Sequence, residues 1–492
     1  MKAKKLITIL IFAFTSCTSL KYPPNEFRGV WVATVVNIDW PKSGDDDAEK
    51  QKSDFIKLLN FYEELNFNAL IVQIRTAGDT FYPSQLNPWS RFLTGKEGVS
   101  KKGFEDPLQW MIDQTHQRGM EFHAWLNPYR ATFDLDTTIL AKTHDFYQHP
   151  DWMLKYGKKY YYNPGIPKVW KHVTKVVKEV VMNYDVDGIH FDDYFYPYQI
   201  VGETFPDSLT YSQYGLENQN LDDWRRSNVD SLVKNVHHTI KSYTPWVQFG
   251  ISPFGVWKNK STDPLGSDTK AGQTTYENLY ADPLLWMKQA WLDYIAPQAY
   301  WSMDYPAASH KKITEWWATH TTNTRLYMGN GAYKIRNNAD KAWNKEKELP
   351  LQLRLSRSIP KVEGNVFFSA KSLPQHPTVT KKIKRKFYAL PAEIPKYSYV
   401  SKQTISDPVI ISNELGSREQ RICISHYNAL PRYLSIYKIN PGKRRLRQLL
   451  KKVYLPKNES RHCFTLESSS KNMELMVKDA FGNESQPIPI PN

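Results

Sequence analysis

One rhythm repeats eight times between about Phe27 and Leu373: a short β-rich run, a polar loop and, in most repeats, a helical pattern. The eight β-rich runs are Arg28–Val35, Asn68–Arg75, Glu121–Asn127, Asp187–Asp192, Val247–Ser252, Tyr294–Tyr300, Arg325–Gly331 and Asn365–Ser369. Eight repeats over roughly 345 residues match the number and size of a (β/α)8 TIM barrel with long loops. A doubly wound open sheet is the alternative, but no glycine-rich phosphate loop follows the first run. We therefore predict an α/β TIM barrel over residues 25–375.

The remainder of the chain has a different pattern. Residues 376–398 are rich in Pro and Lys and are predicted to form a linker. Five short β-like runs separated by polar turns follow, which predicts a small all-β sandwich over residues 399–492. This part is basic, because residues 381–492 hold 21 Lys and Arg against 9 Asp and Glu. A solvated surface or contact with anionic lipid or polymer explains such charge. Nucleic-acid binding is not expected, since no recognition motif accompanies the charge.

The N-terminus has the features of an export signal. Three lysines precede the apolar run Leu6–Phe14, and the small residues Thr15 and Ser16 lead to Cys17. This arrangement resembles a bacterial lipobox, in which the cysteine becomes the lipidated first residue; the alternative is an ordinary signal peptide cut near Cys17. No acidic residue follows Cys17, which favours the outer membrane. We expect residues 1–17 to be a signal peptide with its lipobox cysteine, and the protein to be anchored in the cell envelope by lipid at Cys17, facing the periplasm.

The two other cysteines, Cys423 and Cys463, both lie in β-like runs of the predicted sandwich. An exported compartment permits a disulfide between them, but the sequence does not decide whether it forms. No CxxC motif occurs, and no cofactor or metal is required by any pattern, although a cation held by Asp45–Asp47 stays open.

Strand parity predicts which side chains point into the barrel. In the fourth run, Ile189 and Phe191 suit the helix-facing side, which leaves His190 and Asp192 pointing inward and Asp193 just past the strand end. The same parity turns polar or aromatic side chains inward on three further strands: Gln73, Arg75, His123, Asn127, Gln298 and Tyr300. A purely structural barrel would be filled by branched apolar side chains, so this pattern predicts a polar pocket at its C-terminal face.

The acid doublet Asp192–Asp193 is the strongest chemical signal. Two adjacent carboxylates repel each other, and the following Tyr194, Phe195 and Tyr196 solvate them poorly, so one acid should retain a proton near neutral pH. A protonated acid beside an ionised one can cleave a glycosidic bond. A single Asp at a strand end would more often cap a loop. The 16 Trp and 30 Tyr also suit a sugar ligand, although most of them are expected to pack in the core.

Several blocks resemble one known family, the glycosyl-hydrolase-like family 10, formerly the domain of unknown function 187. The blocks fall in order on successive predicted strands: Phe27–Val32, Asn127–Arg130, Asn163–Gly165, Asp187–Tyr194, Gly250–Gly255, Ala296–Trp301 and Gly329–Gly331. The resemblance covers roughly residues 25–375 and implies a TIM barrel in an envelope lipoprotein. It also implies a glycosidase that acts on peptidoglycan glycan strands without peptides, and a fibronectin-like C-terminal domain.

That substrate suggests a mechanism, because every sugar of peptidoglycan carries a 2-acetamido group that can attack the anomeric carbon itself. The catalytic residues would then be Asp193, which protonates the leaving oxygen, Asp192, which orients the acetamido nitrogen, and Tyr300, which binds the acetamido carbonyl. The rival is direct displacement, with one Asp as nucleophile and an acid such as Asp304 or Asp79 opposite it at about 5 Å.

Substrate-binding roles are assigned to inward and loop residues of the same blocks: Arg75, Asn127, Tyr129, Arg130, His190, Tyr194, Gln298 and Trp301. An arginine fork suits the lactyl carboxylate of muramic acid, but Arg75 and Arg130 could equally pair with the acid doublet. The expected partners are therefore a polysaccharide and, through Cys17, a membrane. Two other functions stay open: an envelope lipoprotein that binds glycan without cutting it, and a glycosidase for another polysaccharide.

Overall fold

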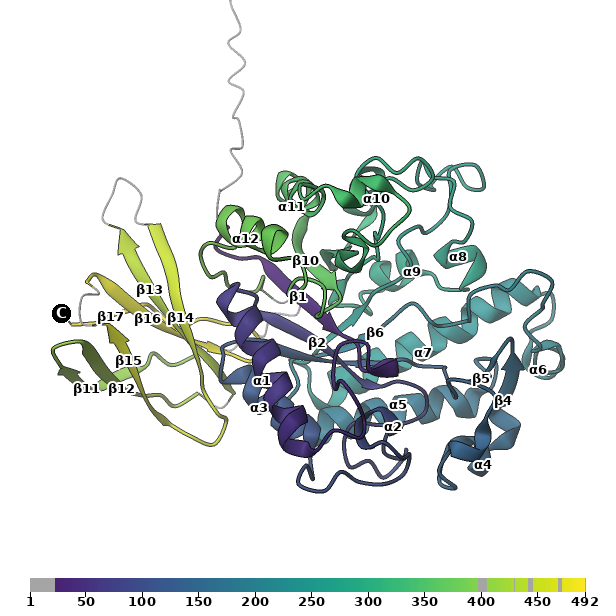
Figure 1. Ribbon diagram of the computed structural model, residues 1–492, viewed down its shortest axis with the longest axis horizontal. Coiled ribbons are helices and arrows are strands. Elements are labelled where there is room, and N and C mark those ends of the chain that lie inside the picture. The colour runs from purple at the N-terminus through teal and green to yellow at the C-terminus, as the bar shows by residue number, and fades with distance from the viewer. Residues whose placement is uncertain (1–22, 397–404, 429, 441–445, 468–470, 492) are drawn as a thin grey trace, which may run out of the picture.

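The computed structural model describes residues 23–396, 405–428, 430–440, 446–467 and 471–491 (Figure 1). Eight parallel strands close into a barrel in the order β1-β10-β9-β8-β7-β6-β3-β2. They are β1 (Phe27–Val32), β2 (Ala69–Arg75), β3 (Glu121–Leu126), β6 (Gly188–Phe191), β7 (Gln248–Ile251), β8 (Tyr294–Ile295), β9 (Arg325–Asn330) and β10 (Val362–Phe368). Each of the eight predicted runs overlaps one strand, so the predicted TIM barrel is confirmed. The sixth run is regular only at its start, because β8 ends at Ile295.

Seven helices that lie between successive barrel strands, or before the last one, pack around the outside of the barrel. They are α1 (Ala48–Glu64), α3 (Pro107–His116), α5 (Pro167–Asn183), α7 (Leu221–Tyr243), α9 (Pro283–Lys288), α10 (His310–His320) and α11 (Glu348–Ser358). Helix α5 illustrates why: Val169, Val173, Val176 and Val180 form one buried stripe at helical spacing. Proline in its first turn suits a position where no backbone N–H is needed.

Short elements interrupt the loops that follow the strands. They are α2 (Arg91–Thr94), α4 (Asp145–Gln148), α6 (Ser208–Tyr214), α8 (Thr275–Asn278) and the hairpin of β4 (Met153–Tyr156) and β5 (Lys159–Tyr162). These loops leave the C-terminal ends of the strands, which is where TIM-barrel enzymes build their sites. No helix of the described residues is both long and apolar enough to cross a membrane.

The segment predicted as a linker contains a helix, α12 (Pro377–Lys386). Its Val379 and Ile383 lie four residues apart and are buried, so α12 packs on the barrel like the other outer helices. The chain then runs past the start of β1, where Glu393 forms a parallel bridge with Asn25. Only part of the predicted 376–398 linker is therefore irregular.

The C-terminal region forms two antiparallel sheets around one core. One sheet has the order β11-β12-β15 and the other β14-β13-β16-β17. The strands are β11 (Val409–Leu415), β12 (Glu419–Ser425), β13 (Pro431–Asn440), β14 (Leu446–Tyr454), β15 (Arg461–Glu467), β16 (Met473–Asp479) and β17 (Ile488–Pro489). A disulfide joins Cys423 and Cys463, which lie directly opposite each other on β12 and β15.

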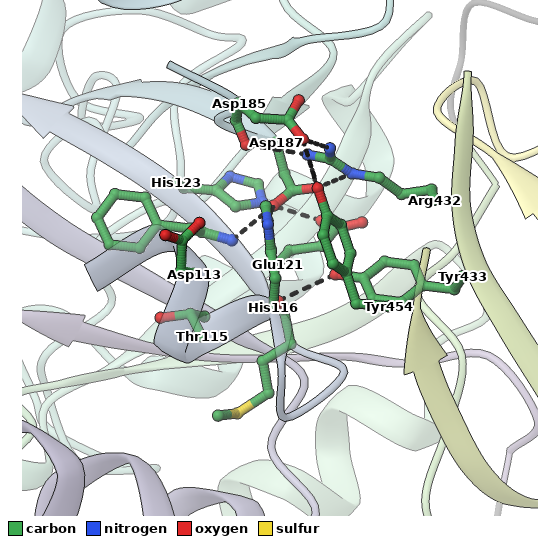
Figure 2. Close-up of polar contacts among 12 residues, drawn as sticks. Asp113, Thr115, His116, Glu121, His123, Asp185, Asp187, Arg432, Tyr433 and Tyr454 are labelled. Atoms are coloured by element: carbon green, nitrogen blue, oxygen red, sulfur yellow. Dashed lines mark hydrogen bonds and ion pairs between the residues drawn. The ribbon is translucent and has the colours of Figure 1, made fainter. Parts of the chain in front are cut away.

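These sheets cover the end of the barrel where its strands begin, opposite the C-terminal loops (Figure 1). The contact is polar and buried. The Glu393 carboxylate accepts hydrogen bonds from the hydroxyls of Ser435, at 2.6 Å, and Tyr437, at 3.0 Å, and its other oxygen lies 3.1 Å from Lys478 Nζ. Figure 2 shows further side chains of the sheets, Arg432 among them, that reach toward the barrel. The two parts therefore share a specific interface.

Candidate active site

A cavity of about 470 Å³ opens at the C-terminal ends of the barrel strands. Its lining combines two carboxylates with cations, neutral polar groups and many aromatic rings. The polar and charged residues of the lining are Asp192, Asp193, Arg130, Lys334, Gln73, Ser252 and Gln298. The aromatic residues are Trp31, Trp125, Tyr194, Tyr198, Phe254, Tyr300, Trp301, Tyr333 and Phe368. The predicted polar pocket at this end of the barrel is therefore present.

The acid doublet follows β6 directly. Ile189 and Phe191 are fully buried in the core between strands and helices, so the alternate positions of the strand turn toward the barrel axis. Gly188 begins this strand, and a Cβ there would lie 2.4 Å from His123 Nδ1, so only glycine fits. The strand thus delivers Asp192 and Asp193 to the cavity, where both are almost fully buried.

Asp192 is held by three N–H donors. Its carboxylate accepts hydrogen bonds from Trp125 Nε1 at 3.1 Å, from Asn127 Nδ2 at 3.0 Å and from the backbone N–H of Tyr194 at 3.2 Å. Burial raises the pKa of Asp192, while the charge of Arg130 and these hydrogen bonds oppose the rise. The donors fix the orientation of Asp192 and stabilise its ionised form.

Asp193 has a different environment. Its Oδ1 accepts a hydrogen bond from Gln298 Nε2 at 3.0 Å, and its Oδ2 accepts one from the Tyr198 hydroxyl. Burial and then the charge of the neighbouring Asp192 raise the pKa of Asp193 to about 6, although both hydrogen bonds oppose that shift. The adjacent acids therefore differ: Asp193 can carry a proton close to neutral pH while Asp192 accepts three N–H bonds.

His190 lies beneath the cavity and does not line it. Its Nε2 accepts a hydrogen bond from Trp31 Nε1 at 3.1 Å and lies 3.0 Å from Ser252 Oγ, while Nδ1 lies 2.9 Å from the Tyr294 hydroxyl. Burial and the nearby His123 lower the pKa of His190, so it is neutral and its proton sits on Nδ1. His190 supports two lining residues, Trp31 and Ser252, and has no position for the direct sugar contact that was predicted.

Three other residues predicted to bind substrate also lie behind the cavity wall: Arg75, Asn127 and Tyr129. Arg75 Nη1 donates to the backbone carbonyl of Asn127 at 2.6 Å, and its guanidinium lies over the Tyr162 ring. Neither of the two predicted roles for Arg75, a sugar contact or an ion pair with the doublet, matches this position. The side chain turns to backbone carbonyls because the loop after β3 supplies acceptors within reach. Asn127 in turn accepts from the Arg130 backbone N–H at 2.9 Å.

The remaining predicted residues line the cavity: Arg130, Tyr194, Gln298, Tyr300 and Trp301. The Arg130 guanidinium lies 4.7 Å from the centre of the Tyr194 ring, which places a cation on an aromatic wall. Burial raises the pKa of Tyr300 well above its usual value, so its hydroxyl keeps its proton and can donate a hydrogen bond. These side chains can contact a bound sugar directly.

Sequence reasoning missed two hydrogen-bond donors to the acid doublet: Trp125, which donates to Asp192, and Tyr198, which donates to Asp193. Trp125 shares the strand parity of His123 and Asn127, so its inward direction could have been predicted. Tyr198 lies on an irregular loop five residues beyond Asp193, where no periodicity applies. Neither rival acid lines the cavity: Asp79 accepts hydrogen bonds within its own turn from Thr76 and Ala77, and Asp304 is exposed. Among the described residues no cluster of three metal-ligating side chains occurs.

The sequence of residues 26–345 matches the family model described as glycosyl hydrolase-like 10. The chain belongs to this family. It is 45% identical over 388 residues to the glycosyl hydrolase YngK of Bacillus subtilis, with 78% of this chain and 76% of that protein covered. It is 40% identical over 364 residues to the glycosyl hydrolase DigH of Escherichia coli K12, with 69% and 82% covered.

Among solved structures, the glycoside hydrolase domain of PgaB from Bordetella bronchiseptica superposes with a TM-score of 0.50. The match covers 74% of this chain and 99% of that domain at 14% identity, and at such low identity it shows the shared fold alone. Family, relatives and fold agree, and the protein is a glycoside hydrolase.

Proposed function

We propose that this glycoside hydrolase cleaves the N-acetylated glycan strands of bacterial peptidoglycan in their peptide-free form. One observation carries the proposal: the two carboxylates among the described residues that line the cavity are neighbours on one loop, Asp192 and Asp193. Direct displacement needs an acid and a nucleophile on opposite faces of the sugar. A sugar with a 2-acetamido group supplies the nucleophile itself, so it suits a site whose acids lie on one side.

In the first proposed step, Asp193 donates its proton to the glycosidic oxygen as the bond from that oxygen to C1 breaks. The acetamido carbonyl oxygen of the same sugar bonds to C1, and the ring that forms carries a positive charge next to the acetamido nitrogen. Asp192, ionised and fixed by Trp125 and Asn127, accepts the hydrogen bond of the acetamido N–H and stabilises that charge. The Tyr300 hydroxyl binds the carbonyl oxygen.

In the second step a water attacks C1 from the side that the leaving group vacated. Asp193, now ionised, accepts a proton from this water as the bond from C1 to the acetamido oxygen breaks. Two inversions at C1 give overall retention of configuration. The aromatic walls, with Trp31 and Trp301, suit the apolar faces of pyranose rings, and Arg130 suits the lactyl carboxylate of muramic acid.

The test is mass spectrometry of the products after residues 22–492 are incubated with peptide-free glycan strands, intact sacculi and chitin oligomers, beside Asp193→Asn. Short saccharides from the peptide-free strands, absent with the variant, are expected, and their reducing-end sugar identifies the cleaved bond. Products from chitin oligomers alone would redirect the proposal to another N-acetylated polysaccharide. No product from any substrate would overturn it.

We also propose that the protein is anchored by lipid at Cys17, in the outer membrane and facing the periplasm. Cys17 lies outside the described residues, so the support is the sequence pattern alone. Cells grown with an alkyne-labelled fatty acid should yield labelled protein in the outer-membrane fraction. Cys17→Ser should remove both the label and the membrane association; a labelled Cys17→Ser protein would contradict the assignment.

A further inference from the structure

A second hollow, of about 630 Å³, lies on the rim of the barrel between helix α5 and the loop that holds α4. We call it the lysine hollow, after Lys168, Lys171 and Lys175 in its wall. It shares no lining residue with the catalytic cavity. Both are nevertheless built on the segment after β3, which also supplies Asn127 and Arg130. The lysine hollow is therefore a separate concave surface at the catalytic end of the barrel.

Its charge is strongly positive. Lys168, Lys171 and Lys175 stand at positions i, i+3 and i+7 of α5, so they share one face of the helix, and all three are exposed. Of the ion pairs found in the described part of the chain, none involves these lysines. The one carboxylate in the wall, Asp145, is buried and already engaged, 2.8 Å from His172 Nε2 and 2.7 Å from the Tyr162 hydroxyl. Like charges at this spacing repel each other and destabilise a helix, and a bound anionic ligand would reduce that repulsion.

The facing wall is aromatic. The His149 imidazole stacks on the Trp152 indole with ring centroids 3.8 Å apart and an interplanar angle of 15°. Trp152 also contacts the His172 ring at 5.3 Å. Neutral side chains, Gln85 and Gln148, complete the lining and can bind hydroxyl groups. The half-buried His149 ring, which the buried Trp152 supports, the amide groups and a row of ammonium groups together suit a sugar that carries a carboxylate.

We propose that the lysine hollow is a second glycan-binding site, which takes a carboxylate-bearing sugar of the strand outside the bond being cut. This inference rests on the proposed function, because peptide-free peptidoglycan strands present one lactyl carboxylate in each disaccharide. The concave shape favours a polymer residue over a flat surface such as a membrane. The site holds long strands on the enzyme and takes no part in the chemistry.

The test variant is Lys168→Gln/Lys171→Gln/Lys175→Gln, in which helix propensity is kept and three charges are removed. Binding is measured by calorimetry in an Asp193→Asn background, so that strands stay intact. Peptide-free strands should bind at least tenfold more weakly to the triple variant than to the parent. Chitin oligomers, which lack the carboxylate, should bind both proteins equally. Added inorganic phosphate should compete only weakly.

A matched control removes three exposed lysines elsewhere, Lys102→Gln/Lys234→Gln/Lys288→Gln, none of which lines either cavity. This control should bind strands like the parent; an equal loss would mean that net charge alone attracts the strands, and would overturn the proposal. Equal binding by the triple variant and the parent would also overturn it. The proposal would also be overturned if phosphate, added at the same concentration of negative charge as the strands, displaced them fully, because the hollow would then be a site for small anions.

Turnover separates this inference from the proposed function. With Asp193 intact, the triple variant should show a severalfold higher KM on long strands and an unchanged kcat, and unchanged kinetics on the shortest cleavable oligosaccharide. If the wild-type protein cleaves no glycan but strands still bind through the three lysines, the proposed function fails and the site stands. If cleavage occurs and the lysines change neither binding nor KM, the function stands and the site fails.

Discussion

Arg432 of the C-terminal sheets forms a two-point contact with Asp187 of the barrel (Figure 2): its Nε and Nη2 donate to the same carboxylate oxygen at 2.8 and 2.6 Å. The other oxygen of Asp187 accepts from the Phe122 backbone N–H at 2.7 Å and lies 2.8 Å from His116 Nε2. Both partners are buried, and Asp187 directly precedes β6, the strand that ends at the acid doublet. The C-terminal sheets thus neutralise the charge of Asp187 at the start of β6, the strand that leads to Asp192 and Asp193.

Removal of Arg432 should therefore destabilise the barrel as well as the sheets. Burial raises the pKa of Asp187, but Arg432 and then His116 hold it well below its usual range, so Arg432→Met removes the largest charge that compensates the buried carboxylate and leaves it only His116 and the Phe122 N–H. We expect the free energy of unfolding in urea to fall by about 3–5 kcal/mol, the usual cost of breaking a buried ion pair. Lys457→Met, which removes a half-exposed partner of Asp185, should cost less than about 1 kcal/mol. Similar losses for both variants would contradict this account.

The activity should fall as pH rises through about 6. Asp193 must hold a proton to protonate the leaving oxygen, and burial and the charge of Asp192 raise its pKa to about 6, so the competent fraction declines above that pH. The profile of kcat/KM on peptide-free strands should therefore show a descending limb centred near pH 6. A profile that stays flat from pH 5 to 8 would exclude Asp193 as the acid.

Tyr198→Phe should move that limb to higher pH. The Tyr198 hydroxyl donates to Asp193 Oδ2, a bond that favours the ionised carboxylate, so its loss should raise the pKa of Asp193 further above its usual value. The variant should consequently keep a larger fraction of its maximal kcat/KM at pH 7 than the parent keeps of its own. A limb that moves toward lower pH would contradict the assigned hydrogen bond.

The sequence was sufficient to predict the barrel and the position of the acid doublet, because both follow from period-2 alternation along strands. Asp192, directly after β6, lines the cavity as strand parity required; Tyr300 also lines it, but it lies beyond the end of β8, where parity no longer applies. Parity gives only the direction in which a side chain leaves the strand. It could not show that Arg75 ends on the Asn127 carbonyl, because that depends on loop acceptors brought close by the fold.

Local sequence patterns did not predict two elements of the structure, helix α12 and strand β14. The cluster of prolines around residues 374–395 concealed the apolar spacing of Val379 and Ile383, and helix α12 was interpreted as a linker. Strand β14 was not predicted because its apolar residues do not alternate: Leu449 and Leu450 are adjacent, at the irregularity in its pairing with β13. Its Lys452 is nevertheless buried beside Glu393, a long-range contact that no local pattern contains.

Asn127 should act as a positioning residue for Asp192. Its amide donates to the Asp192 carboxylate and its Oδ1 accepts from the Arg130 backbone N–H, so Asn127→Ala should remove one of the three donors that orient Asp192 and loosen the Arg130 loop. We expect kcat on peptide-free strands to fall about 10- to 100-fold with KM changed less than threefold. Asn228→Ala, at an equally buried amide on α7 outside the cavity, controls for stability and should keep kcat. Equal effects of the two variants would assign Asn127 a purely structural role.

The disulfide between Cys423 and Cys463 should stabilise the whole protein. It closes a 40-residue segment, and the loop entropy removed from the unfolded chain corresponds to about 4 kcal/mol, of which engineered and native examples deliver about 2–4. Cys423→Ser/Cys463→Ser should lower the free energy of unfolding in urea by about 2–4 kcal/mol. Unfolding of the sheets breaks the Arg432–Asp187 ion pair and the Glu393 contacts with Ser435, Tyr437 and Lys478, so the two parts should unfold together. Tryptophan fluorescence and loss of glycosidase activity should then follow a single shifted transition. An early transition that leaves activity intact would show that the sheets unfold alone and that the Arg432 contact does not couple the two parts.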